Sequence, residues 1–209
     1  MIKLPYVSPN LFLNKNIALV GSSGSLNGAN FGEKIDFFDE VIRFNRAPTL
    51  GYETDVGCKT TLRVSNNHVF DNLDLGFEQY TNYNPKFIKD LRYSRILYIG
   101  DPVKPWGRRN ENSHQTNELY LFDYKSINKI KDFINANFQQ NLLVGTIIIA
   151  LCVMAGIRPT IFGYDLELLP RTHYWQKRPS EADFKNHCPS EEIFIIKSLL
   201  DKGLINCNL

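Results

Sequence analysis

The chain has 209 residues, of which 43% are hydrophobic and 22% charged, a length and composition that suit one globular domain with a buried core. A formal net charge of +2 gives no indication of a nucleic-acid-binding protein. Residues 1–16 lack the apolar stretch of a signal peptide, and no apolar run reaches about 18 residues, so we expect a cytoplasmic protein without a transmembrane segment.

The first predicted element is a short buried strand, Ile17–Val20, which ends in a loop of small residues. The loop contains Gly21, Ser22, Ser23, Gly24 and Ser25. Glycines let the main chain approach a ligand closely, and the N–H groups of such a turn point toward an anion. A second strand, Glu40–Phe44, leads into Asn45, and parallel strands end at the same edge of a sheet. The pattern therefore predicts a phosphate-binding loop with the Asn45 amide beside it.

The rest of the chain alternates between predicted strands and helices. Further strands are expected at residues 60–64, 96–99 and 119–122 and at Thr160–Phe162. An amphipathic helix is predicted over residues 125–138, an apolar helix over residues 142–155, and a last helix from Pro189 to about residue 200. The alternation predicts a single domain, residues 1–209, with an α/β sandwich around a mostly parallel sheet, whose ligand lies at the carboxyl ends of the strands.

Two segments, residues 101–117 and 170–187, combine basic and aromatic side chains and are predicted to be active-site loops or a lid, with ordinary surface loops as the alternative. Their cations, which are candidates for binding acidic groups or else plain surface charges, are Lys104, Arg108, Arg109, Arg171, Lys177 and Arg178. His173 precedes two aromatic residues, and His187 precedes the last helix, which has Glu191 and Glu192 in its first turn. A nearby carboxylate would orient the His187 ring and raise its basicity, as a general base requires.

Two common nucleotide-binding signatures fit poorly. No Gly-Lys-Ser/Thr follows the first loop, so it is not a Walker A sequence. A nicotinamide dinucleotide site remains an alternative, because Asp39 lies roughly 20 residues beyond the glycines, although it precedes its strand instead of ending it. There is no D-x-D pair, and the four cysteines lack metal-type spacing, so we expect no metal and reduced thiols.

Residues 17–61 resemble the large sialylmotif of the animal-type sialyltransferases, glycosyltransferase family 29. The resemblance runs through Val20-Gly21-x-Ser23-Gly24, Arg43-x-Asn45-x-Ala47-Pro48-Thr49 and Gly51-Tyr52-Glu53-x-Asp55-Val56-Gly57-x-Lys59-Thr60-Thr61. The stretch from Gly145 to Gly163-Tyr164 resembles the small motif. His173-Tyr174-Trp175 resembles the third motif, and His187 with Glu192 resembles the very small motif.

This resemblance implies a GT-A-like, Rossmann-like three-layer sandwich and an inverting, metal-independent transfer of sialic acid, or a related ulosonic acid such as Kdo, from a CMP-activated donor to a glycan or glycolipid hydroxyl. It implies no further cofactor. His173 would assist the leaving phosphate and His187 would take the proton of the acceptor. The residues that it places around the donor are Gly21, Ser22, Ser23, Gly24, Ser25, Asn45, Gly145, Thr146, Gly163, Tyr164, Tyr174 and Trp175.

The chain also departs from the family pattern. Asparagines of the family are replaced by Ser22 and Ser25, and a Ser/Thr pair by Leu143-Val144. The family disulfide is missing, since its positions correspond to Ile17 and Gly156. The missing disulfide fits a short, soluble family member of microbial or viral kind. A non-catalytic CMP-sugar-binding module and a nicotinamide-dependent oxidoreductase are the alternative functions.

Overall fold

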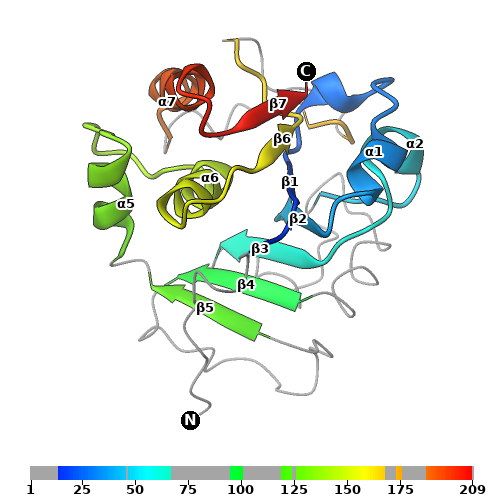
Figure 1. Ribbon diagram of the computed structural model, residues 1–209, viewed down its shortest axis with the longest axis horizontal. Coiled ribbons are helices and arrows are strands. Elements are labelled where there is room, and N and C mark those ends of the chain that lie inside the picture. The colour runs from blue at the N-terminus through cyan, green and yellow to red at the C-terminus, as the bar shows by residue number, and fades with distance from the viewer. Residues whose placement is uncertain are drawn as a thin grey trace, which may run out of the picture.

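The computed structural model describes residues 14–45, 47–66, 95–100, 119–123, 126–167, 173–175 and 187–208. In these residues the strands form one seven-stranded sheet with the order β5-β4-β3-β2-β1-β6-β7 (Figure 1). The strands are β1 (Ile17–Val20), β2 (Glu40–Phe44), β3 (Leu62–Asn66), β4 (Arg95–Gly100), β5 (Leu119–Asp123), β6 (Thr160–Phe162) and β7 (Asn206–Asn208). All six strand pairings are parallel, which confirms the predicted sheet.

The direction in which strands are added reverses at β1. The chain adds β2, β3, β4 and β5 in order on one side of β1, and then crosses to place β6 and β7 on the other side. Ligands of open parallel sheets bind outside the carboxyl ends of the strands at such a reversal. A ligand is therefore expected at the carboxyl ends of β1 and β6.

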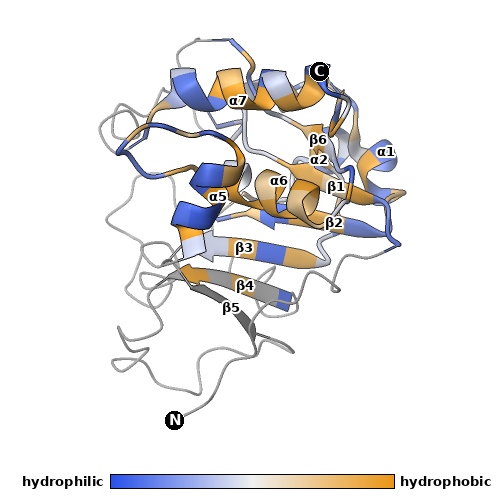
Figure 2. Cartoon of the chain, turned by 60° about the vertical axis from the view of Figure 1, so that its left-hand side comes forward, coloured by the Kyte–Doolittle hydropathy of each residue, from blue (hydrophilic) through white to orange (hydrophobic). Residues whose placement is uncertain are grey.

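Helices cover both faces of the sheet and complete a three-layer sandwich (Figure 1). The short helices α1 (Gly32–Asp36) and α2 (Glu53–Val56) lie on one face, and α5 (Ile127–Phe133), α6 (Val144–Met154) and α7 (Pro189–Asp201) lie on the other. Figure 2 shows α6 hydrophobic along its length, as a helix packed between the sheet and other helices must be, whereas α5 and α7 carry hydrophilic residues. The apolar cores on the two faces of the sheet fix the positions of its strands, and so of the loops at their carboxyl ends.

Most element bounds agree with the sequence analysis, and the differences have local causes. The predicted strand 60–64 is Leu62–Asn66 instead; just before it, the Val41 N–H donates to the Thr61 hydroxyl, a side-chain atom, where a strand ladder would use a main-chain carbonyl. The predicted helix 125–138 is only Ile127–Phe133, because Asn135 adopts a left-handed conformation with φ 54°. The edge strand β7 was not predicted, because Asn206, Cys207 and Asn208 lack an apolar pattern.

All four cysteines are free thiols: Cys58, Cys152, Cys188 and Cys207. Burial raises the pKa of the Cys152 thiol to about 12, so this group is an inert part of the core. Within the described ranges no helix is long and apolar enough to cross a bilayer.

Candidate functional site

The glycine-rich loop joins the ends of β1 and β6. The Gly21 N–H donates to the Phe162 carbonyl at 2.8 Å, and the Ser23 N–H donates to the Gly163 carbonyl at 3.2 Å. A Cβ atom on Gly21 would lie 2.3 Å from the Gly163 oxygen, so no other residue fits at position 21 without moving the main chain. The predicted loop is thus fixed against the strand on the far side of the topological reversal.

The main chain of this loop offers hydrogen-bond donors. A short 3-10 turn, Gly24–Leu26, follows it, and the Ser23 hydroxyl accepts from the Ser25 N–H at 3.1 Å and from the Ser25 hydroxyl at 3.0 Å. Among the described residues, no acceptor faces the N–H group of Ser22. Main-chain N–H groups in a glycine-rich turn that ends a strand form a concave site that suits an anion.

The segment His173–Trp175 lies against the same loop. Ser23 and His173 form an antiparallel bridge, and the Tyr174 N–H donates to the Ser22 carbonyl at 3.1 Å. The His173 ring stacks on Trp175 with centroids 4.6 Å apart and an interplanar angle of 26°. The bridge thus places the half-buried His173 beside the turn that was predicted to bind the phosphate.

Tyr174 anchors this segment. Its side chain is 3% exposed, its hydroxyl donates to the Pro48 carbonyl, and its ring meets Tyr52 edge to face at 5.1 Å. Tyr174 was predicted to contact a nucleotide, but the structure places it in the core under α1 and α2. The contact with Pro48 ties the segment to the loop that follows β2.

Asn45 ends β2 in a left-handed conformation, with φ 47°, next to the β1 loop. Its N–H donates to the Val64 carbonyl at 2.8 Å. The fully buried Arg63 donates to the carbonyls of Asn45 and Ala47 at 3.1 and 3.0 Å. This supporting role of Arg63 was not predicted, although a charged residue between two apolar residues of a strand indicates a buried polar contact.

Gly145 and Thr146 lie in the first turn of α6. A Cβ atom on Gly145 would lie 2.8 Å from the hydroxyl oxygen of Tyr164, which follows Gly163 at the end of β6. The Tyr164 hydroxyl is buried and has no partner among the described residues, and burial raises the pKa of this phenol well above its usual value. The first turn of α6 thus packs against the end of β6.

Thr146 and Glu192 are bonded to each other. The Thr146 hydroxyl donates to the Glu192 carboxylate, which also accepts from the Leu143 N–H at 3.0 Å. Glu192 is 1% exposed and caps the positive N-terminus of α6. The structure therefore assigns both side chains a role in joining α6 to α7.

His187 stands just before α7. Its Nδ1 atom lies 2.8 Å from the Asn141 carbonyl, which can only accept a hydrogen bond. In the neutral ring the proton therefore sits on Nδ1, which leaves Nε2 as the hydrogen-bond acceptor of the ring. A carboxylate was expected to orient this ring. Among the described residues the contact is instead a main-chain carbonyl, and Glu192 is engaged at α6.

Topology brings both histidines to one edge of the sheet. The helix α7 leads into β7, which is parallel to β6, so its N-terminus and His187 lie at the carboxyl edge. His173 lies at the end of β1, at the same edge. The residues 101–117, 170–172 and 176–186, with the six cations named above, lie outside the described residues. Within the described ranges no three His, Cys, Asp or Glu side chains could together hold a metal ion.

Comparisons with known proteins all find sialyltransferases. A sequence model described as glycosyltransferase family 29 (sialyltransferase) matches residues 14–204. Beta-galactoside alpha-2,6-sialyltransferase 2 of Bos taurus is 48% identical over 140 residues, which are 61% of this chain and 28% of that protein. The same enzyme of Homo sapiens is 48% identical over 90 residues, which are 43% of this chain and 15% of that protein. The chain thus spans under a third of the length of these relatives.

A solved structure shows the same fold. The crystal structure of a mammalian sialyltransferase in complex with Gal-beta-1-3GalNAc-ortho-nitrophenol superposes with a TM-score of 0.66. The match covers 96% of this chain and 71% of that one at 17% identity. At this identity the likeness concerns the fold alone.

Proposed function

Because the chain belongs to glycosyltransferase family 29, the sialyltransferases, we propose that it transfers sialic acid, or a related ulosonic acid, from a CMP-activated donor to a sugar hydroxyl of a glycan or glycolipid. The observation that carries the proposal is the glycine-rich loop at the reversal between β1 and β6, with His173 bridged to it. A nucleotide phosphate is the ligand that such a loop suits best.

In this proposal the donor lies along the carboxyl edge of the sheet. The Ser22 N–H binds the phosphate, and Asn45, held by Arg63, binds at the neighbouring strand end. Tyr164 and Gly145 border the site from the β6 side. Tyr174 acts indirectly, because its bond to Pro48 positions His173.

The proposed reaction is a single inverting displacement that uses two imidazoles in place of a metal. The bond from the anomeric carbon to the phosphate oxygen breaks, and CMP leaves with the electron pair. A hydrogen bond or proton from His173 stabilises the charge that forms on the phosphate. The acceptor oxygen bonds to the anomeric carbon from the opposite face, and its proton passes to Nε2 of His187.

Nucleotide selectivity tests the donor assignment. We expect CMP to raise the melting temperature of the protein, whereas NAD leaves it unchanged, because only a ligand of the native state stabilises it. At a CMP concentration of 100 times the Kd the gain is about 2.7 kcal/mol. Differential scanning fluorimetry with CMP, CDP, UDP and NAD measures this. Stabilisation by NAD and none by CMP would restore the oxidoreductase alternative.

The transferred sugar and its acceptor need a separate assay. CMP-sialic acid and CMP-Kdo are offered in parallel with a β-galactoside, the acceptor class in the names of the relatives. Release of CMP with formation of a glycoside identifies the donor. Binding of CMP without any transfer or hydrolysis would favour a non-catalytic module.

The close packing of Gly21 provides a prediction about the loop itself. Replacing Gly21 with alanine should destabilise the fold by about 1–3 kcal/mol, because the new methyl group meets the Gly163 carbonyl. It should also weaken CMP binding, since the loop must shift. Gly28→Ala is the control: position 28 has φ 76° but nothing within 4 Å, so CMP binding should persist there. Urea denaturation and CMP titration measure both effects.

A further inference from the structure

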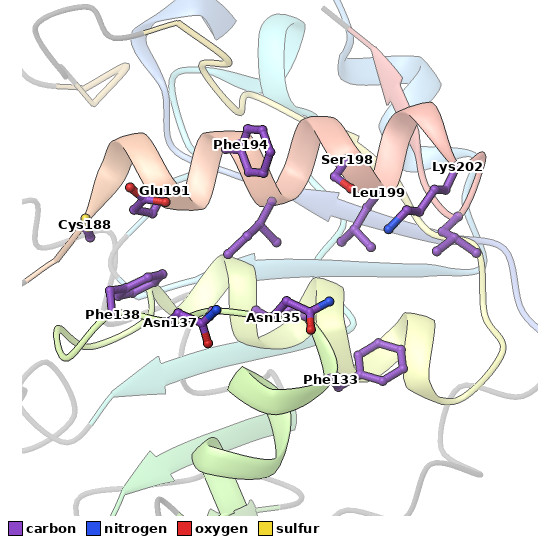
Figure 3. A pocket seen from close by; sticks show the side chains of 14 residues that line it. Phe133, Asn135, Asn137, Phe138, Cys188, Glu191, Phe194, Ser198, Leu199 and Lys202 are labelled. Atoms are coloured by element: carbon purple, nitrogen blue, oxygen red, sulfur yellow. The ribbon is translucent and has the colours of Figure 1, made fainter.

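A groove of about 430 Å³ lies outside the site described above, between α7 and the segment that follows α5. Figure 3 shows Phe194, Ser198 and Lys202 on the helix wall, with Asn135, Asn137 and Phe138 on the facing wall. The helix α7 has 13 residues, so the groove follows an element about 20 Å long. Its volume lies within the range of small-ligand sites.

The lining combines aromatic faces with amides. Phe194 is 71% exposed and Phe133 is 45% exposed, although large apolar side chains are usually buried. Asn135 and Asn137 are exposed beside them, and each amide can donate and accept hydrogen bonds. A pyranose presents an apolar C–H face and a rim of hydroxyls, so aromatic surface flanked by amides matches both of its parts.

The wall opposite α7 is held in shape without a ligand. Lys131 donates to the carbonyls of Phe138 and Gln140 at 2.9 and 2.7 Å, and its ammonium lies 5.2 Å from the centroid of the Phe138 ring. The Ala136 N–H donates to the Lys131 carbonyl at 2.8 Å. A preformed wall reduces the entropy lost when a ligand binds.

The groove ends beside His187. Cys188, the next residue, lines that end of the groove. Asn141, whose carbonyl binds the His187 ring, lies three residues beyond Phe138 on the opposite wall. Both walls therefore lead, along the chain, toward His187, which takes the proton of the acceptor hydroxyl in the proposed function.

We propose that this groove binds the part of an acceptor oligosaccharide that lies beyond the sugar being modified. The inference rests on the proposed function, in which His187 marks the acceptor side. A membrane surface fits the groove less well, because Glu191 and Lys202 in its lining carry opposite charges, whereas anionic lipids require a basic surface.

Kinetics with acceptors of increasing length test the proposal. Methyl β-galactoside has one ring, and lacto-N-neotetraose carries a terminal β-galactose on three further sugars. We expect Phe194→Ala to raise the KM for the tetrasaccharide roughly five- to tenfold, the loss of one aromatic contact, and to leave kcat and the KM for the monosaccharide unchanged. The matched control is Phe37→Ala, since Phe37 is 90% exposed at the end of α1. Equal effects on both acceptors, or none, would overturn the proposal.

A binding measurement separates this proposal from the transferase assignment. Saturation-transfer NMR with lacto-N-neotetraose and no donor should show contacts that Phe194→Ala removes and Phe37→Ala keeps. Such contacts without any transfer would support the groove and count against the proposed function. Transfer with no groove-dependent contacts would do the reverse. If Phe194→Ala instead abolished self-association or binding to phosphatidylserine vesicles and left sugar binding unchanged, the groove would serve another partner. That result would refute the inference.

Discussion

Replacing His187 with alanine is expected to lower turnover by roughly 10²- to 10⁴-fold, the range for a lost general base. The Asn141 carbonyl fixes the proton on Nδ1 and leaves Nε2 free to accept the acceptor proton. Alanine removes the ring nitrogen that takes this proton, and it removes no group that binds the CMP-sugar. CMP affinity, measured by calorimetry, should therefore stay within about twofold of the original, a difference below 0.5 kcal/mol.

Two further measurements separate a base from a merely structural histidine. Slow hydrolysis of the CMP-sugar without acceptor should persist in His187→Ala, because an attacking water can lose its proton to bulk solvent, whereas a bound acceptor hydroxyl depends on a positioned base. Added imidazole should restore part of the lost transfer. Normal turnover in the variant would remove His187 from the mechanism.

The sheet and the ends of its central strands were predictable from local sequence. Ile17–Val20 and Thr160–Phe162 are short apolar strands that end in glycine, and the structure reproduces both bounds. The contact between Gly21 and Gly163 was not predictable, because those residues are far apart in the chain and meet only once β6 pairs with β1. A glycine assigned to ligand approach proved also to be required by packing.

The supporting contacts of the site were hidden for a related reason. The partner of His187 is the main-chain carbonyl of Asn141, and every residue has such a group, so no residue type signals it. The adjacent glutamates made a carboxylate partner look favourable, but helix geometry turns Glu192 into the core toward Leu143 and Thr146. Local patterns indicate which residues matter and leave their partners to the tertiary structure.

Replacing His173 with alanine is expected to lower turnover by about 10²- to 10³-fold, the cost of one donor that stabilises charge in the transition state. Its bridge to Ser23 brings the ring beside the loop that is proposed to hold the phosphate. A residue that assists the leaving group serves every acceptor, water included. Acceptor-independent hydrolysis of the CMP-sugar should therefore fall with transfer, in contrast to His187→Ala.

The control for His173 is its stacking partner. Trp175→Phe keeps an aromatic ring against the imidazole, where the centroids are now 4.6 Å apart, and should retain most activity. Hydrolysis and transfer, followed by CMP release with and without acceptor, give four rates for each variant. If His173→Ala raised only the KM for the acceptor, the ring would act on the acceptor side. Because the two variants are expected to differ in hydrolysis, the comparison also assigns leaving-group assistance and proton removal to separate histidines.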